Sequence, residues 1–148
     1  MAEFGAGLDC LGFRAPLRLG ESDGCNYGFV PNTLHADGDP TDVLVLCDFD
    51  LAPGVVIRCR PVGVLKMEDD GGMDDKLIAV PVEKVDPFQA GIQDLTDIPQ
   101  KTRDRIKHFF EHYKDLEPNK WVKVTGWGDS AKARQLILES IERAGPDA

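Results

Sequence analysis

An acidic bend at Asp37–Asp42, followed at once by an apolar strand, constrains this chain more than any other stretch. The bend reads Asp-Gly-Asp-Pro-Thr-Asp, and its Gly38 and Pro40 exclude a helix. The next residues, Val43–Leu46, are typical of a buried strand. Carboxylates crowded this closely repel one another and lose hydration on folding unless a cation lies among them. Oxygen ligands suit Mg2+ or Mn2+, although a solvated acidic turn would have the same composition.

A second acidic stretch, Glu68–Asp75, lies between two β-rich stretches, Val55–Met67 and Lys76–Val82. Its two adjacent glycines predict a hairpin turn. A hairpin alone does not need so many acids. If its tip faces the bend at Asp37–Asp42, five or more carboxylates converge. Such a density suits more than one divalent ion, which together can activate water and clamp a phosphoryl group.

Four side chains are candidates for holding phosphate oxygens. Tyr113 and Lys114 are adjacent near the end of a predicted helix. Tyr27 lies within residues 25–30, which could form a short strand or a bend, and Lys76 begins a predicted strand. Each also has a purely structural interpretation, as a core tyrosine or a solvated lysine. Their assignment therefore depends on whether the fold brings them to the acidic segments.

Net charge limits the classes of partner. The formal charge of the 148 residues is -9, which argues against a nucleic-acid surface. An anionic substrate would also be repelled unless bound cations reverse the local field. No apolar run is long enough to span a bilayer, and no secretory signal is evident. We therefore expect a cytoplasmic location and no membrane partner. The length of the chain indicates one domain over residues 1–148.

The four cysteines contain no C-x-x-C pair, which argues against a structural zinc site. A chain of this length folds without disulfides, so we expect reduced thiols. They are Cys10, Cys25, Cys47 and Cys59.

The order of predicted elements indicates an α+β fold. Several strands are followed by a helix, a strand over 121–127 and a final helix, without a βαβ rhythm. The first helix carries apolar residues at helical spacing, namely Ile106, Phe109, Phe110, Tyr113 and Leu116. The last helix does the same with Ala133, Leu136, Ile137, Ile141 and Ala144, and Gly145 follows it. We predict a small antiparallel barrel-like sheet with two packed helices.

Taken together, these segments resemble the soluble family I inorganic pyrophosphatases of bacterial type. The resemblance runs from about Cys25 to the C-terminal helix. The segments that carry it are Cys25-Asn-Tyr-Gly28, Asp37-Gly-Asp-Pro-Thr-Asp42 with the strand after it, Pro53–Met67, Asp74–Pro81, His108-Phe-Phe-Glu-His-Tyr-Lys-Asp-Leu-Glu117, Lys120–Val124 and Gly126-Trp127.

The resemblance implies a five-stranded OB-like barrel and hydrolysis of diphosphate to two phosphates by in-line attack of metal-activated water. It implies several Mg2+ ions per site, with Mn2+ as an alternative, and a homo-oligomer, commonly a hexamer. Carried over by position, Asp37, Asp42, Asp69 and Asp74 resemble the metal ligands, Asp39 the general base, and Tyr27, Lys76, Tyr113 and Lys114 the groups that bind substrate.

The resemblance fails over residues 1–24. The family supplies a metal-contacting Glu, a phosphate-binding Lys and a phosphate-binding Arg before the Tyr27 segment. Arg14 or Arg18 could replace the Arg, and no replacement for the other two is evident. Lost strand material there would also leave an open sheet edge. A catalytically impaired relative that only binds metal and phosphate is therefore the main alternative.

Other motifs give weaker alternatives. His108-Phe-Phe-Glu-His112 matches the H-x-x-E-H signature of zinc peptidases, but no third ligand is evident. In the pyrophosphatase family this helix contributes to subunit contacts instead. Asp37-x-Asp39-x-Thr41 matches the nucleophile loop of haloacid-dehalogenase-type phosphatases, but it does not follow a buried strand.

A binding module without enzymatic activity is a further alternative, and two forms of it fit poorly. An EF-hand fails because Asp42 occupies the position where the calcium loop needs glycine. A nucleic-acid-binding OB module should have a basic groove with stacking aromatic residues, which the net charge of -9 argues against.

Overall fold

The computed structural model describes residues 8–18 and 24–146, with the backbone alone described for residues 8–18. Its elements in chain order are β1 (Leu8–Arg18), β2 (Gly24–Phe29), β3 (Asp42–Leu46), β4 (Ile57–Asp69), β5 (Gly72–Met73), β6 (Lys76–Pro81), the 3-10 turns η1 (Pro87–Gln89) and η2 (Leu95–Asp97), α1 (Gln100–His112), β7 (Val122–Gly128) and α2 (Ser130–Ala144). Neither α-helix has the length and apolar character that crossing a bilayer requires.

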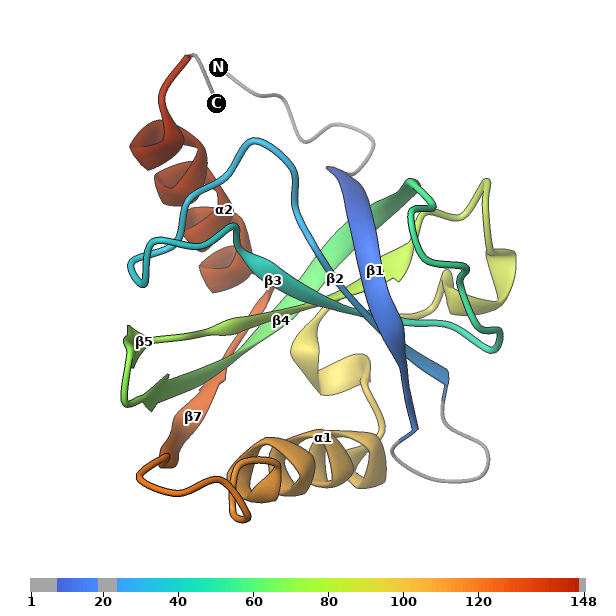
Figure 1. The fold of residues 1–148 in the computed structure, drawn as a ribbon. Coiled ribbons are helices and arrows are strands. Elements are labelled where there is room, and N and C mark those ends of the chain that lie inside the picture. Colours follow the sequence, from blue (N-terminus) through green and yellow to red (C-terminus); the bar gives the residue numbers. More distant parts are fainter. Residues whose placement is uncertain (1–7, 19–23, 147–148) are drawn as a thin grey trace.

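The strands form a small barrel-like sheet (Figure 1). Pairing runs in the order β1-β2-β3-β6-β4, and β4 also pairs with β1. This arrangement confirms the predicted α+β class, a small OB-like barrel with two packed helices. One pairing differs from the antiparallel prediction, because β3 and β6 are parallel. The connection between them runs through β4 and β5, which is long enough to allow a parallel pair.

The backbone of β1 fills the sheet edge that the sequence predicted to be open. Its residues pair with β2 from Leu11 to Arg18 and with β4 from Leu8 to Cys10. The prediction of an open edge here is therefore wrong, because the backbone of Leu8–Arg18 supplies a strand. The side chains of Arg14 and Arg18 lie outside the described part of the structure, as does that of Cys10.

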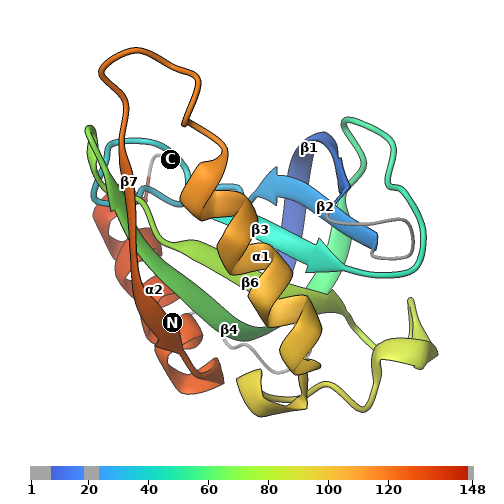
Figure 2. The ribbon, with the colours of Figure 1, turned by 90° about the horizontal axis from the view of Figure 1, so that it is seen from below.

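The core lies on both faces of β3 and β6, and this explains their uninterrupted apolar sequences. Val43, Val45, Leu77 and Ala79 pack in one cluster with Ala133 and Ile137 of α2. The intervening residues Leu44, Leu46, Ile78 and Val80 pack in the other cluster with Ile106 and Phe110 of α1. Figure 2 shows α1 lying across the face formed by β3, β6 and β4, with α2 on the other side of β4.

Both predicted helices are present, but only α2 ends where the sequence predicted. Helix α2 begins after Asp129, whose side chain accepts a hydrogen bond from the Lys132 N–H, and ends at Gly145 with a φ of 78°. Helix α1 ends at His112, one turn earlier than its apolar pattern predicted. Leu116 consequently lies outside the helix and is 98% exposed.

The early end of α1 has a consequence for the site. Beyond the helix the chain turns back toward β7, and Lys114 reaches Asp69 at the end of β4. The acidic hairpin thereby gains a cation from the segment that follows α1.

Candidate active site

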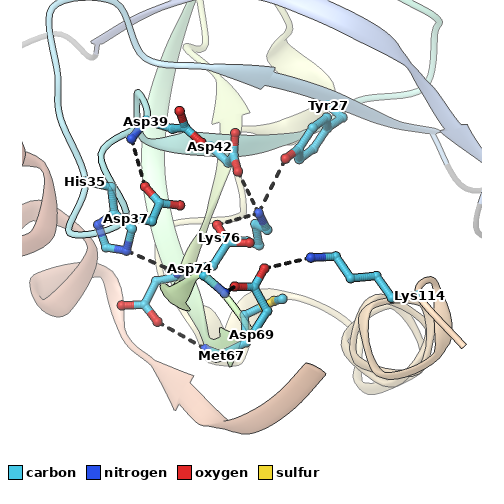
Figure 3. A network of polar contacts seen from close by, with 12 residues as sticks. Tyr27, His35, Asp37, Asp39, Asp42, Met67, Asp69, Asp74, Lys76 and Lys114 are labelled. Atoms are coloured by element: carbon cyan, nitrogen blue, oxygen red, sulfur yellow. Dashed lines mark hydrogen bonds and ion pairs between the residues drawn. The ribbon is translucent and has the colours of Figure 1, made fainter. Parts of the chain in front are cut away.

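All nine sequence-predicted site residues line a single pocket of about 450 Å3. They come from four parts of the chain: β2, the bend that ends at β3, the β4–β5–β6 hairpin, and the segment after α1. Figure 3 shows the bend and β2 on one side of the pocket and the hairpin on the other. The nine are Asp37, Asp39, Asp42, Asp69, Asp74, Tyr27, Lys76, Tyr113 and Lys114.

The acidic bend holds its side chains by local hydrogen bonds. Gly38 has a φ of +92°, which a residue with a side chain rarely adopts, so glycine is required at the turn. The carboxylate of Asp37 accepts the N–H of Asp39 at 3.0 Å. Asp39 itself is exposed, and within residues 25–146 no ion pair engages its carboxylate. Asp39 is therefore available to accept a proton from a molecule in the pocket.

Lys76 is the centre of a buried group that we call the Lys76 group, comprising Lys76, Asp42 and Asp74. Its ammonium lies 2.6 Å from Asp42 and 2.8 Å from Asp74, and Lys76 is 2% exposed. The same ammonium donates to the Tyr27 hydroxyl at 3.4 Å and lies 5.8 Å from the centre of the Phe110 ring. One lysine thus holds together a carboxylate from each of the two acidic stretches.

The Lys76 group has unequal electrostatics because one ammonium serves two carboxylates. Burial by itself would lower the pKa of Lys76, but the charge of Asp42 and its neighbours outweighs burial and raises that pKa. Burial raises the pKa of Asp74 to about 6, despite the opposing effect of Lys76. Asp74 is therefore the member of the group that most readily takes up a proton.

A second, shallower group, which we call the Lys114 group, comprises Lys114, Asp69 and Asp70. The ammonium of Lys114 lies 2.7 Å from Asp69 and 4.0 Å from Asp70. Burial opposes the ionisation of Asp69, yet the hydrogen bonds from Lys114 and from the Gly71 N–H lower its pKa. Asp69 therefore stays ionised more readily than Asp74.

Two further charged residues line the pocket that the sequence did not single out. Asp70 adds a carboxylate, and Lys120 binds it at 2.9 Å from the loop before β7. Asp70 follows the predicted ligand Asp69 in the acidic stretch, and Lys120 begins a segment that carries the resemblance, so these positions were the available signals. With them, six carboxylates and three ammonium groups line the pocket, which leaves a formal balance of −3.

The two predicted tyrosines remain hydroxyl donors at neutral pH. Burial is the main reason that the pKa of Tyr27 lies above its ordinary value, and the same holds for Tyr113. Tyr113 and Lys114 follow α1 directly, and the Tyr113 ring stacks on Phe109 at 5.7 Å. The hydroxyls can therefore donate hydrogen bonds to anionic oxygens in the pocket.

The donor set fits divalent cations in its chemistry. Every candidate ligand is a carboxylate oxygen, which suits a hard cation such as Mg2+. The excess of carboxylates over lysines leaves negative charge for such ions to neutralise. No three Asp, Glu, His or Cys side chains among the described residues are gathered into a ready metal site. The Lys76 ammonium, between Asp42 and Asp74, provides positive charge at the point where the two acidic stretches meet.

The zinc-peptidase motif and the haloacid-dehalogenase-type motif lack the surroundings that those sites require. His108 and His112 lie on α1 with ring centres 4.5 Å apart, and His112 contacts Asp115 at 2.9 Å. In the described part of the chain they belong to no set of three ligands, as a zinc peptidase would require. The Asp37–Thr41 motif follows a loop rather than a strand, unlike the nucleophile loop of a haloacid-dehalogenase-type phosphatase.

The described cysteines are structural. Cys25 and Cys47 are free and buried, in agreement with the prediction of reduced thiols, and Cys59 is buried as well. Burial raises the pKa of the Cys25 thiol to about 12, so it stays protonated.

Comparisons with known proteins give this pocket a context. The family model described as inorganic pyrophosphatase matches residues 11–145. The inorganic pyrophosphatase of Xanthomonas campestris pv. campestris is 56% identical over 124 residues, which cover 84% of this chain and 70% of that protein.

Two solved structures agree with this chain in fold as well as in sequence. An inorganic pyrophosphatase from Coxiella burnetii is 40% identical with a TM-score of 0.86, covering 97% of this chain and all of that one. The enzyme from Helicobacter pylori is 42% identical with a TM-score of 0.84, covering 94% of each chain. The similarity therefore includes the β1 region as well as the pocket.

Proposed function

This chain belongs to the inorganic pyrophosphatase family, and on that premise we propose that it hydrolyses inorganic diphosphate to two phosphates with divalent cations. The composition of the pocket is the observation that carries the proposal. Six carboxylates, three lysines and two tyrosines face one space of about 450 Å3. The carboxylates alone would repel diphosphate, so the substrate must enter with cations that reverse the local charge.

We assign the cation ligands to Asp37, Asp42, Asp69 and Asp74. Bound divalent cations supply a more acidic water and neutralise charge on the phosphate oxygens. Mg2+ is the proposed ion, with Mn2+ as an alternative, because all the donors are oxygens. The chain's own contribution is to hold ligands from the bend and the hairpin on opposite sides of the substrate.

Asp39 is the proposed general base. It is exposed to the pocket, while Asp42 and Asp74 are engaged by Lys76. A carboxylate that is not held by an ammonium can take a proton from the attacking water. The attack is direct and in line, without a phosphorylated enzyme.

The lysines and tyrosines hold the substrate. Lys76 and Lys114 stay protonated beside their carboxylate partners, and Tyr27 and Tyr113 keep their hydroxyl protons. These four side chains donate to phosphate oxygens, and charge-assisted contacts of this kind are each worth roughly 1.5–3 kcal/mol. They also stabilise the charge that develops on the departing phosphate.

Phosphate release from diphosphate by the purified chain tests the proposal. We expect fast release with Mg2+ and none with EDTA. In Asp39→Asn the loss of the base should lower turnover by two or more orders of magnitude while thermal unfolding is unchanged. Wild-type-like turnover in that variant would remove Asp39 from the role of base.

A catalytically impaired relative that only binds metal and phosphate is the second candidate. It is favoured by residues 1–24, which contain no lysine and in which no counterpart of the family's metal-contacting Glu is evident. A folded chain that binds Mg2+ and phosphate but releases no phosphate from diphosphate would support this alternative. Fast release would show that other groups replace the missing ones.

Three finer assignments complete the proposal. We treat residues 1–148 as one inorganic pyrophosphatase domain and place it in the cytoplasm. We further propose a homo-oligomer, and a hexamer is the expected state. Light scattering coupled to size-exclusion chromatography would decide the assembly, since a monomer under all conditions would contradict it.

A further inference from the structure

Two buried residues outside the predicted set, His35 and Asp75, lie directly behind the acidic pocket. They are 4% and 8% exposed, respectively. The backbone N–H of Asp75 donates to Nε2 of His35 at 3.2 Å. Figure 3 shows the His35 ring on the side of the bend, directed toward the segment that carries Asp74. This bond joins two segments that are far apart in the sequence.

His35 also closes the bend through its own backbone. Its N–H donates to the Asp39 carbonyl at 2.8 Å, and its carbonyl accepts the Gly38 N–H at 3.0 Å. The ring and the backbone of one residue therefore hold the turn that carries Asp37 and Asp39. A shift of the His35 ring would move both carboxylates together.

Asp75 fixes the other end of the bond to the hairpin. Its carboxylate accepts the Met67 N–H of β4 at 3.1 Å, and the N–H of Asp74 donates to the Met67 carbonyl at 3.0 Å. The side chain of Asp74 meanwhile binds Lys76 in the pocket. Asp74 and Asp75 lie between β5 and β6 and bind different partners, so Asp75 holds the hairpin backbone while Asp74 binds Lys76 in the pocket.

A separate contact holds the outer side of the same bend. The Leu34 N–H donates to the Ser140 carbonyl of α2 at 3.0 Å, and the Arg143 guanidinium donates to the Leu34 carbonyl at 2.9 Å. These bonds anchor the bend to α2 but do not reach the hairpin. The bend thus has an outer anchor at α2 and an inner bond to Asp75, in the segment between β5 and β6 that also carries Asp74.

From these contacts we propose that His35 is a positioning residue for the divalent-cation site. Through its Nε2 bond to Asp75, it sets the spacing between the carboxylates of the bend and Asp74. The inference rests on the proposed diphosphate hydrolysis, because those carboxylates are the proposed cation ligands. Groups that orient metal ligands typically change metal affinity by roughly 10- to 100-fold when they are removed.

The bond requires one tautomer of His35. A backbone N–H can only donate, so Nε2 must carry a lone pair and the ring proton must lie on Nδ1. The chain has three histidines, so 15N labelling of histidine resolves this directly in the metal-free protein. Comparison with a His35 variant assigns the resonance. A proton on Nε2 would overturn the proposal, independently of any activity.

Two substitutions at His35 separate the hydrogen bond from the packing. His35→Phe keeps a ring of similar size but removes the acceptor, whereas His35→Gln keeps an acceptor oxygen at a similar reach. We expect His35→Phe to weaken Mg2+ binding, measured by calorimetry without diphosphate, by at least tenfold. His35→Gln should stay within about threefold of wild type. Equal affinities for Mg2+ in wild type and His35→Phe would overturn the proposal.

Arg143→Met supplies the matched control, because it breaks the outer anchor of the same bend and leaves the inner bond intact. We expect a lower melting temperature but a Mg2+ affinity within about twofold of wild type. If Arg143→Met weakens Mg2+ binding as much as His35→Phe, general loosening of the bend explains both effects and the proposal fails.

Wild-type hydrolysis of diphosphate is measured in parallel. A wild-type chain without activity but with the expected Mg2+ pattern would contradict the proposed function and leave the positioning role standing. If His35→Phe does not fold, the tautomer measurement and the affinity of His35→Gln still decide the proposal.

Discussion

The Lys76 group and the Lys114 group contain the same kinds of side chain at different depths. The side chain of Lys76 is 3% exposed and its ammonium lies within 2.8 Å of both carboxylates, whereas the side chain of Lys114 is 19% exposed and its ammonium is close to only one carboxylate. A buried ion pair is costly to break, because the remaining charge is left without a partner. A shallower pair lets water solvate the remaining charge. The Lys76 group should therefore support the fold as well as the reaction, and the Lys114 group mainly the reaction.

The largest expected difference is in stability. Lys76→Met leaves two buried carboxylates facing each other, so we expect the free energy of unfolding to fall by roughly 3–5 kcal/mol at pH 7. Urea unfolding without metal measures this. Lys114→Met is the matched control. Equal losses in the two variants would remove the distinction between the groups.

The free energy of unfolding should depend on pH with opposite signs through Asp74 of the Lys76 group and Asp69 of the Lys114 group. Asp74 has a folded pKa of about 6 against an ordinary value of 3.8, so the native chain holds more protons there than the unfolded chain in this window. The free energy of unfolding should therefore fall as pH rises from about 4 to 6, by at most about 3 kcal/mol. Asp69 has a lowered pKa, so its contribution is present above its ordinary value and is lost as pH falls below it.

Urea unfolding of the metal-free chain between pH 3 and pH 7 tests both signs. Asp74→Asn should remove the fall in stability between pH 4 and 6, and Asp69→Asn should remove part of the loss at lower pH. The prediction for Asp74 fails if Asp74→Asn keeps the wild-type slope through this window.

The two acidic stretches were predictable because each is a local pattern. Asp37–Asp42 and Glu68–Asp75 combine acids with turn residues in consecutive positions, so their place at the ends of strands follows from the sequence. The faces of β3 and β6 were predictable for a similar reason, since an uninterrupted apolar run implies burial on both sides.

The contacts between the stretches were not predictable from local patterns. Lys76 was singled out as a substrate contact, but its position between Asp42 and Asp74 depends on the parallel register of β3 and β6. The bond between His35 and Asp75 joins residues 40 positions apart and gives no signal in either segment. The end of α1 at His112 was also missed, because Tyr113 and Leu116 continue the apolar spacing while the chain already turns toward β7.

The two groups should also differ in their effect on Mg2+ affinity, by a smaller free energy than their effect on stability. Asp42→Ala removes a proposed ligand, whereas Lys114→Ala removes a proposed substrate contact. We expect the Mg2+ concentration for half-maximal binding to rise about tenfold or more in Asp42→Ala, which corresponds to about 1.4 kcal/mol, and to change little in Lys114→Ala. Calorimetry with Mg2+ alone measures both. The reverse order would exchange the roles of the two groups.

The smallest expected effect is the change in stability in Lys114→Met. Its ammonium is partly solvated, so losing the pair with Asp69 should cost less than about 1 kcal/mol in urea unfolding. The same variant should raise the KM for diphosphate, because it removes a phosphate contact that the fold does not need. A large loss of stability with an unchanged KM would show that Lys114 serves the fold, and the contrast with Lys76 would then disappear. Lys114→Arg, which keeps the charge, should restore part of the affinity for diphosphate if the contact is electrostatic.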